Sequence, residues 1–228
     1  MLLIFIIFLL IGWSIQTKLK SKIKKYSSIK ISSNLSGKEV AEKMLIDHGI
    51  TKVSIVSVPG RLTDHYNPQN MTINLSKEVY YGKSISSAAI ASHECGHAVQ
   101  HANAYRWLEM RSKLVPIVSF SSKMINFIFI AGMFGMGIMR LFTLDIVILT
   151  IIFSQLMVTI FSLITLPVEY DASNRAVKWL ENANITSGNE TTAAKDALNW
   201  AAKTYLVAAL SSLTYLLYYI MIFLNNRN

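Results

Sequence analysis

Residues 85–105 read ISSAAIASHECGHAVQHANAY, and this stretch governs the interpretation of the whole chain. Within it, HECGH at residues 93–97 matches the HExxH pattern of hydrolytic zinc sites. At about 100° per residue, the two histidines lie about 40° apart on one helix face, so both imidazoles can reach a single ion. The Glu94 carboxylate lies one residue round from His93 and can face the open side of that ion. The pattern therefore predicts a site on a helix for one Zn2+ ion.

The helix that carries this motif is predicted to span Ile85 to Tyr105, with Ser84 or Ser86 near its N-terminal cap. Small residues recur along it, at Ala88, Ala89, Ala91, Gly96 and Ala98. Small side chains let neighbouring elements approach closely. We therefore expect a second element to pack tightly against this helix.

The composition is that of a membrane protein rather than an ordinary soluble domain. Of the 228 residues, 52% are hydrophobic and only 15% are charged. The single cysteine, Cys95, excludes an intramolecular disulfide and suits a reducing compartment.

The formal net charge of +9 is compatible with binding either nucleic acid or anionic lipid. A basic run from Lys18 to Lys30 directly follows the first apolar stretch. Beside a membrane, attraction to anionic lipid contributes about 1 kcal/mol per basic residue. The distribution of charge therefore predicts membrane lipid, and no nucleic acid, as a partner.

Four apolar runs are long enough, or nearly long enough, to cross a bilayer. We expect transmembrane helices at about residues 1–16, 115–139, 141–166 and 204–224. The first run has no basic region before it and no cleavage site after it, so it is interpreted as an uncleaved anchor, with a cleaved signal peptide as the alternative. The second and third runs meet around Arg140 and are expected to form a hairpin.

Basic residues are distributed unequally between the two sides that this topology defines. Segments 16–114 and 167–203 hold 15 and 4 of the Lys and Arg residues, and the other side holds two. The positive-inside rule places the two larger segments in the cytoplasm. We predict a single multi-pass domain over residues 1–228 in the cell membrane, with catalytic segments 30–113 and 167–203 on the cytoplasmic side.

Two β-rich stretches are expected between the first span and the motif helix. Val53–Val58 and Met71–Leu75 flank a turn-rich segment at residues 64–70, and this arrangement predicts a short antiparallel β-hairpin. If Met71–Leu75 forms an exposed edge, an extended peptide could add to it through main-chain hydrogen bonds.

A catalytic zinc ion needs a third protein ligand and an open position for water. Residues 166–176, LPVEYDASNRA, follow the third apolar run and contain a proline suited to the first turn of a helix. The hairpin of the second and third spans returns the chain to the side on which the HECGH motif lies. Glu169 is therefore the first candidate for the third ligand, and Asp171 is the second.

Several segments resemble the YugP-type family of membrane neutral zinc metallopeptidases: HECGHAVQ from residue 93, Tyr66-Asn67-Pro68, Leu75-Ser76 and LPVEYDAS from residue 166. The resemblance covers nearly the whole chain. It implies a mainly α membrane protein whose cytosolic portion is zincin-like and α+β. It also implies gluzincin-type roles for four residues, with His93, His97 and Glu169 as zinc ligands and Glu94 as the general base.

The activity expected of such a site is zinc-dependent endopeptidase activity in a membrane. A zinc-activated water would attack the peptide bond, while Glu94 takes its proton and passes it to the leaving amine. Related gluzincins carry Asp at the position of Ser173, so Asp171 is a candidate for supporting a ligand histidine instead. Candidates for binding the developing oxyanion are His65, Tyr170 and Arg175.

A non-catalytic membrane scaffold or assembly factor with a structural zinc site is the main alternative. A transport or channel subunit ranks below it, because the spans contain few ionisable residues and no repeated broken-helix pattern. Glu94 favours the enzyme, because a structural site has no use for a free carboxylate beside its ligands. The expected partner is accordingly a peptide or protein substrate.

Overall fold

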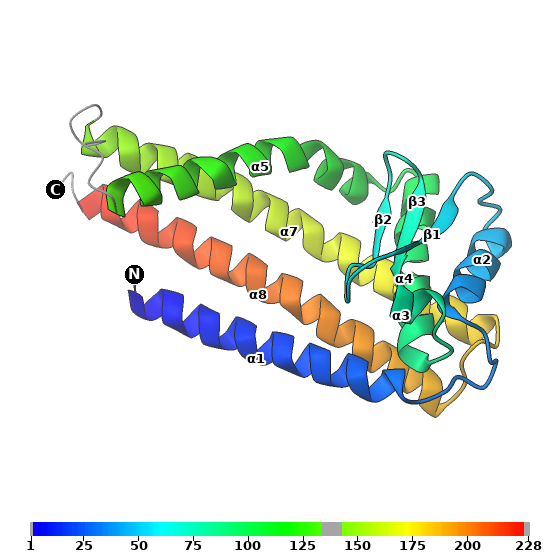
Figure 1. Ribbon diagram of the computed structural model, residues 1–228. Coiled ribbons are helices and arrows are strands. Elements are labelled where there is room, and N and C mark those ends of the chain that lie inside the picture. The colour runs from blue at the N-terminus through cyan, green and yellow to red at the C-terminus, as the bar shows by residue number, and fades with distance from the viewer. Residues whose placement is uncertain (1, 134–142, 226–228) are drawn as a thin grey trace. The chain divides into compact units, whose positions relative to one another are not determined.

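A computed structural model describes residues 2–133 and 143–225 of the chain. The described part is mainly helical and contains one small sheet (Figure 1). Its elements are α1 (Leu2–Ser27), α2 (Gly37–Asp47), β1 (Ser54–Val58), β2 (His65–Asn67), β3 (Thr72–Ser76), α3 (Lys77–Tyr80), α4 (Ile85–Ala102), α5 (Arg106–Met133), α7 (Leu144–Asn182) and α8 (Asn189–Asn225).

In the described part of the chain, four helices are long and apolar enough to cross a membrane, as the sequence predicts. They are α1, α5, α7 and α8, and each extends beyond its apolar part. Large apolar side chains on them face outward, as Leu3 and Phe127 do. The expected junction around Arg140, with the adjoining ends of the second and third spans, lies outside the described residues.

The chain divides into two compact units. The first comprises Met1–Gly12, Glu109–Leu166 and Tyr205–Asn228, and the second comprises Trp13–Leu108 and Pro167–Thr204. The second unit contains the sheet, α4 and nearly all of the two segments expected to be catalytic. That the whole chain forms a single domain stays a prediction.

Pro167 does not begin a helix, contrary to the expectation from sequence. It lies inside α7, which runs without interruption from Leu144 to Asn182. A proline in a helix interior removes one main-chain hydrogen bond and usually costs about 3 kcal/mol. Burial of Val168 and Ala172, both fully inaccessible to solvent, offsets that cost on the following turns. The third apolar run and the Glu169 segment therefore belong to one helix.

The sheet has the strand order β1-β3-β2, which corrects the predicted pairing. β1 is parallel to β3, with Ser54 opposite Thr72, whereas β2 is antiparallel to β3. The antiparallel hairpin therefore consists of β2 and β3. The predicted antiparallel pairing of Val53–Val58 with Met71–Leu75 is wrong, because the turn-rich segment 64–70 itself contributes β2. This additional strand reverses the chain once more, so that β1 and β3 are parallel.

This order also shows that Met71–Leu75 is not an edge. β3 is the central strand, and its residues Ile73 and Leu75 are fully buried. Strand addition to this segment is therefore ruled out, and the two edges of the sheet are β1 and β2. β2 is the edge strand that lies against α4.

The core of the second unit lies between the sheet, α2 and α4. Val40 and Met44 of α2 are fully buried there, and so is Cys95 of α4, whose Sγ atom lies 3.6 Å from the Ala41 carbonyl oxygen. α2 begins with a capping box, in which Ser36 and Glu39 bind each other's main-chain N–H groups. Cys95 is thus a packing residue. Because the side of α4 that carries Cys95 packs into this core, the opposite side of the helix points away from the core.

Candidate metal centre

The predicted motif helix is α4, which starts at Ile85 with Ser84 as its cap. The Ser84 hydroxyl accepts a hydrogen bond from the main-chain N–H of Ser87 at 3.2 Å. One turn apart on this helix, the rings of His93 and His97 have centroids 4.8 Å apart and lie nearly perpendicular to each other. Both imidazoles therefore face the same side of α4.

α7 approaches α4 very closely at Gly96, as the run of small residues predicts. A Cβ atom at Gly96 would lie 2.6 Å from the carbonyl oxygen of Ala172, which is too close for any side chain. On α7, Glu169 lies three residues before Ala172, and Ser173 directly follows it. The close approach therefore brings both of their side chains to the histidines.

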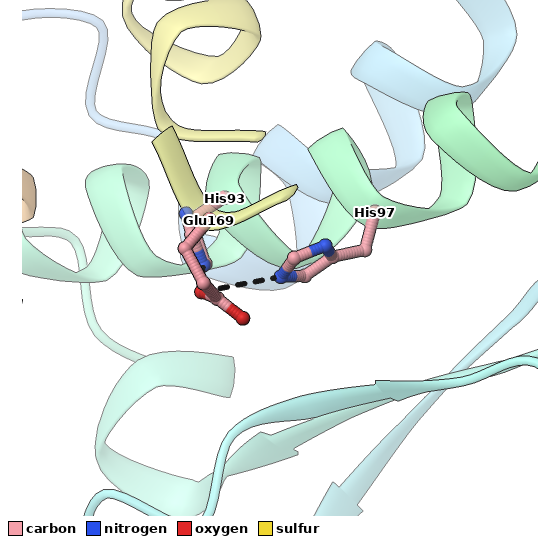
Figure 2. Close-up of side chains that lie close together, drawn as sticks. All are labelled: His93, His97 and Glu169. Carbon is pink, nitrogen blue, oxygen red and sulfur yellow. Dashed lines mark ion pairs between the residues drawn. The ribbon is translucent and has the colours of Figure 1, made fainter. Parts of the chain in front are cut away.

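Glu169 completes a cluster of three potential ligands (Figure 2). Its Oε2 atom lies 3.4 Å from Nε2 of His93 and 3.7 Å from Nε2 of His97. These separations exceed the usual hydrogen-bond range of about 2.7–3.2 Å. They resemble the ~3.4 Å between the ligand atoms of a tetrahedral zinc site, whose metal–ligand bonds are about 2.1 Å long. Two imidazoles and one carboxylate thus fit a catalytic zinc ion in both chemistry and spacing.

Glu169 is held in the form that a metal ligand requires. Burial alone would raise the pKa of this carboxyl group, because only 1% of the residue is exposed. His93 and His97 outweigh burial and hold the pKa of Glu169 well below its usual range. The side chain is therefore ionised at neutral pH.

Each histidine ring is oriented through its other nitrogen. Nδ1 of His93 lies 3.1 Å from the Ser173 hydroxyl, and Nδ1 of His97 lies 3.0 Å from the Gln100 side-chain oxygen. Partners of this kind fix ring orientation and tautomer, so that the Nε2 atoms are presented to a metal. Ser173 thus contacts His93. Gln100 was not anticipated from sequence, although its spacing of three residues from His97 places it on the same helix face.

Asp171 lies outside the ligand cluster. Its Oδ2 atom accepts hydrogen bonds from Nε2 of Gln100 at 2.8 Å and from Nε of Arg175 at 2.6 Å. Gln100 also donates to the carbonyl oxygen of Val168 at 2.8 Å. Asp171 and Arg175 therefore support His97 through Gln100 and tie α4 to α7.

Glu94 lies beside the cluster and is bound by the sheet. Its Oε2 atom accepts a hydrogen bond of 2.9 Å from the main-chain N–H of Tyr66 in β2. Burial, assisted by the negative charges of Glu169 and Asp64, raises the pKa of Glu94 to about 7, against the opposing effects of His93 and the Tyr66 N–H. Such a carboxyl group can both accept and donate a proton near neutral pH.

Of the candidates for binding the oxyanion, His65 and Tyr170 have surroundings that do not link them to the cluster. His65 is exposed, and its Nδ1 atom lies 2.8 Å from the Thr63 carbonyl oxygen, while Tyr170 is 39% exposed. His101 contacts the Tyr66 hydroxyl through Nδ1 at 2.7 Å and is not a member of the cluster of His93, His97 and Glu169. Tyr66 thus joins Glu94 and His101, a role that its sequence position did not indicate.

A family model described as "Putative neutral zinc metallopeptidase" matches residues 1–224. The chain belongs to this family. It is also similar to the "Putative membrane protease YugP" of Bacillus subtilis (strain 168), with 42% identity over 230 residues that cover 100% of this chain and 99% of the relative. No solved structure matches. Membership confirms the resemblance identified from the sequence motifs and implies zinc as the metal.

Proposed function

We propose that this protein is a zinc-dependent endopeptidase of the cell membrane, with one zinc ion held by His93, His97 and Glu169. The observation that carries the proposal is the convergence of two Nε2 atoms and one carboxylate oxygen from α4 and α7, within 4.8 Å of one another. Two histidines and a glutamate are the protein ligands of several catalytic zinc sites, in which a fourth position stays open for water. The family supports the same reaction class.

The bound ion would polarise the scissile carbonyl and lower the pKa of a water molecule from about 15.7 to about 7. Glu94 acts as the general base in this scheme, because its raised pKa and its position next to His93 suit it to take a proton from the attacking water. It then returns the proton to the leaving amine. The N–H of Tyr66 holds the carboxylate in place during both transfers.

The catalytic unit is proposed to face the cytoplasm. Most Lys and Arg residues lie in segments 16–114 and 167–203, on one side of the four spans. Flexible peptide segments near the membrane would be the substrates, and membrane lipid would surround the four apolar helices.

The proposal is tested by metal analysis and peptide cleavage with the purified full-length protein in detergent. Glu169→Gln should lose zinc and activity, whereas Glu181→Gln, an exposed carboxylate on the same helix, should keep both. Asp171→Asn should retain more zinc than Glu169→Gln, because Asp171 acts only through Gln100. Unchanged zinc content in Glu169→Gln would remove Glu169 from the ligand set.

The non-catalytic scaffold remains the competing function and predicts a different pattern. A structural zinc site would bind the metal as the enzyme does, but the wild-type protein would cleave no peptide. Cleavage that a chelator abolishes and zinc restores separates the enzyme from the scaffold.

A further inference from the structure

The second unit contains a pocket with a volume of about 390 Å³. Ligand-binding pockets commonly have volumes of roughly 300–1,000 Å³, so this one can hold a side chain and part of a peptide. Its walls come from the C-terminal half of α1, the loop between β1 and β2, the β3–α3 junction and the first turns of α4.

The pocket lies next to the candidate metal centre. One of its wall residues, Ile90, precedes His93 by three positions on α4 and so lies on the same face of that helix. Another, Asp64, precedes Tyr66 by two positions, and Tyr66 donates its N–H to Glu94. The pocket thus touches both elements that hold the reacting groups, although it contains none of the three ligands.

Two lysines of the pocket, Lys20 and Lys24, have no ion-pair partner in the described part of the chain. Arg61 pairs with Glu78 at 3.1 Å, and Asp64 accepts a 2.7 Å hydrogen bond from the main-chain N–H of Ser76. Lys20 and Lys24 lie one turn apart on α1, and neither forms an ion pair within the described part of the chain. Lys20, Lys24 and Arg61 against Asp64 and Glu78 give the pocket a formal net charge of +1, and its two lysines without an ion-pair partner are available to an incoming acidic group.

We propose that this pocket is a substrate subsite that binds an acidic side chain of the peptide, with Lys20 and Lys24 as its counter-charges. The inference rests on the proposed peptidase function. The apolar side chains of Ile23, Val79 and Ile90 line the same pocket and would contact the aliphatic part of a bound glutamate or of its neighbour. Since Lys20 and Lys24 directly follow the first apolar run, the subsite favours acidic segments close to the membrane surface.

The test compares matched peptides with the zinc-loaded full-length protein in uncharged detergent. Glutamate is moved one position at a time through a neutral peptide, and each peptide is paired with its glutamine counterpart. We expect one position at which glutamate raises kcat/KM about two- to fivefold per lysine, the range of partly solvated ion pairs. Lys20→Gln and Lys24→Gln should remove this preference through KM, whereas Lys18→Gln, an exposed lysine of α1 outside the pocket, should keep it.

A charge reversal sharpens the test, because Lys24→Glu should shift the preference to lysine at the same peptide position. Cleavage of all peptides without any preference for glutamate would overturn the subsite and leave the peptidase intact. Absence of cleavage and of bound zinc would overturn both. If the variants instead affect both members of each pair equally, and only in vesicles containing phosphatidylglycerol, the lysines bind lipid and the subsite is refuted.

Discussion

Replacement of Gly96 by alanine should weaken metal binding although it changes none of the three ligand residues. The added Cβ atom would lie 2.6 Å from the Ala172 carbonyl oxygen, and ordinary contact begins at 3.4 Å. To reach that distance, α4 and α7 must separate by about 0.8 Å, whereas metal–ligand distances tolerate about 0.2 Å. Glu169 moves with α7, so its oxygen would be drawn away from His93 and His97.

The expected loss of zinc affinity for Gly96→Ala is about 10- to 100-fold, comparable to the loss of a group that orients a ligand. Overpacking should also destabilise the protein by about 1–3 kcal/mol. Zinc affinity is measured by competition with a chromogenic chelator, and stability by thermal unfolding in detergent. Gly132→Ala is the matched control, because a Cβ atom there meets nothing within 4 Å on α5. Wild-type zinc affinity in Gly96→Ala would refute the close-approach argument.

Three further predictions concern the groups around the cluster. Glu94→Gln should keep zinc, measured by elemental analysis, and lose at least about 100-fold in kcat; near-normal turnover would exclude Glu94 as the base. Gln100→Leu and Ser173→Ala should each weaken zinc binding about 10- to 100-fold in the chelator competition, and unchanged affinity would show that the Nδ1 contacts are dispensable. Since the folded pKa of Glu94 lies above its usual value of 4.5, the metal-free protein should lose about 3 kcal/mol of stability as the pH rises from 4.5 to 7. Unfolding of metal-free Glu94→Gln should lack this part of the pH dependence, and identical profiles would contradict the assignment.

The sequence predicts the elements that depend only on residues close together in the chain. Spacing and composition predict HECGH on a helix, a serine cap at Ser84 or Ser86, and the four apolar helices, and tertiary contacts do not override them. The sequence predicts Glu169 near the histidines through the expected topology, in which a hairpin of spans returns the chain to the same side.

Other features depend on contacts between distant residues and could not be predicted. β2 has only three residues, so the pairing that makes β1 parallel to β3 leaves little trace in the sequence. Pro167 is tolerated inside α7 because neighbouring residues are buried against the rest of the second unit. Gln100 and Tyr66 gain their roles only when α7 and β2 are packed against α4.

The ligand order along the chain has a consequence for biosynthesis. His93 and His97 leave the ribosome early, but Glu169 follows only after α5 and the apolar part of α7 have been made. An unfinished chain therefore carries two of the three metal-binding side chains and no complete centre. If the protein is the proposed peptidase, its activity can therefore arise only after α1, α5 and the apolar part of α7 have been synthesised, whereas α8 still follows.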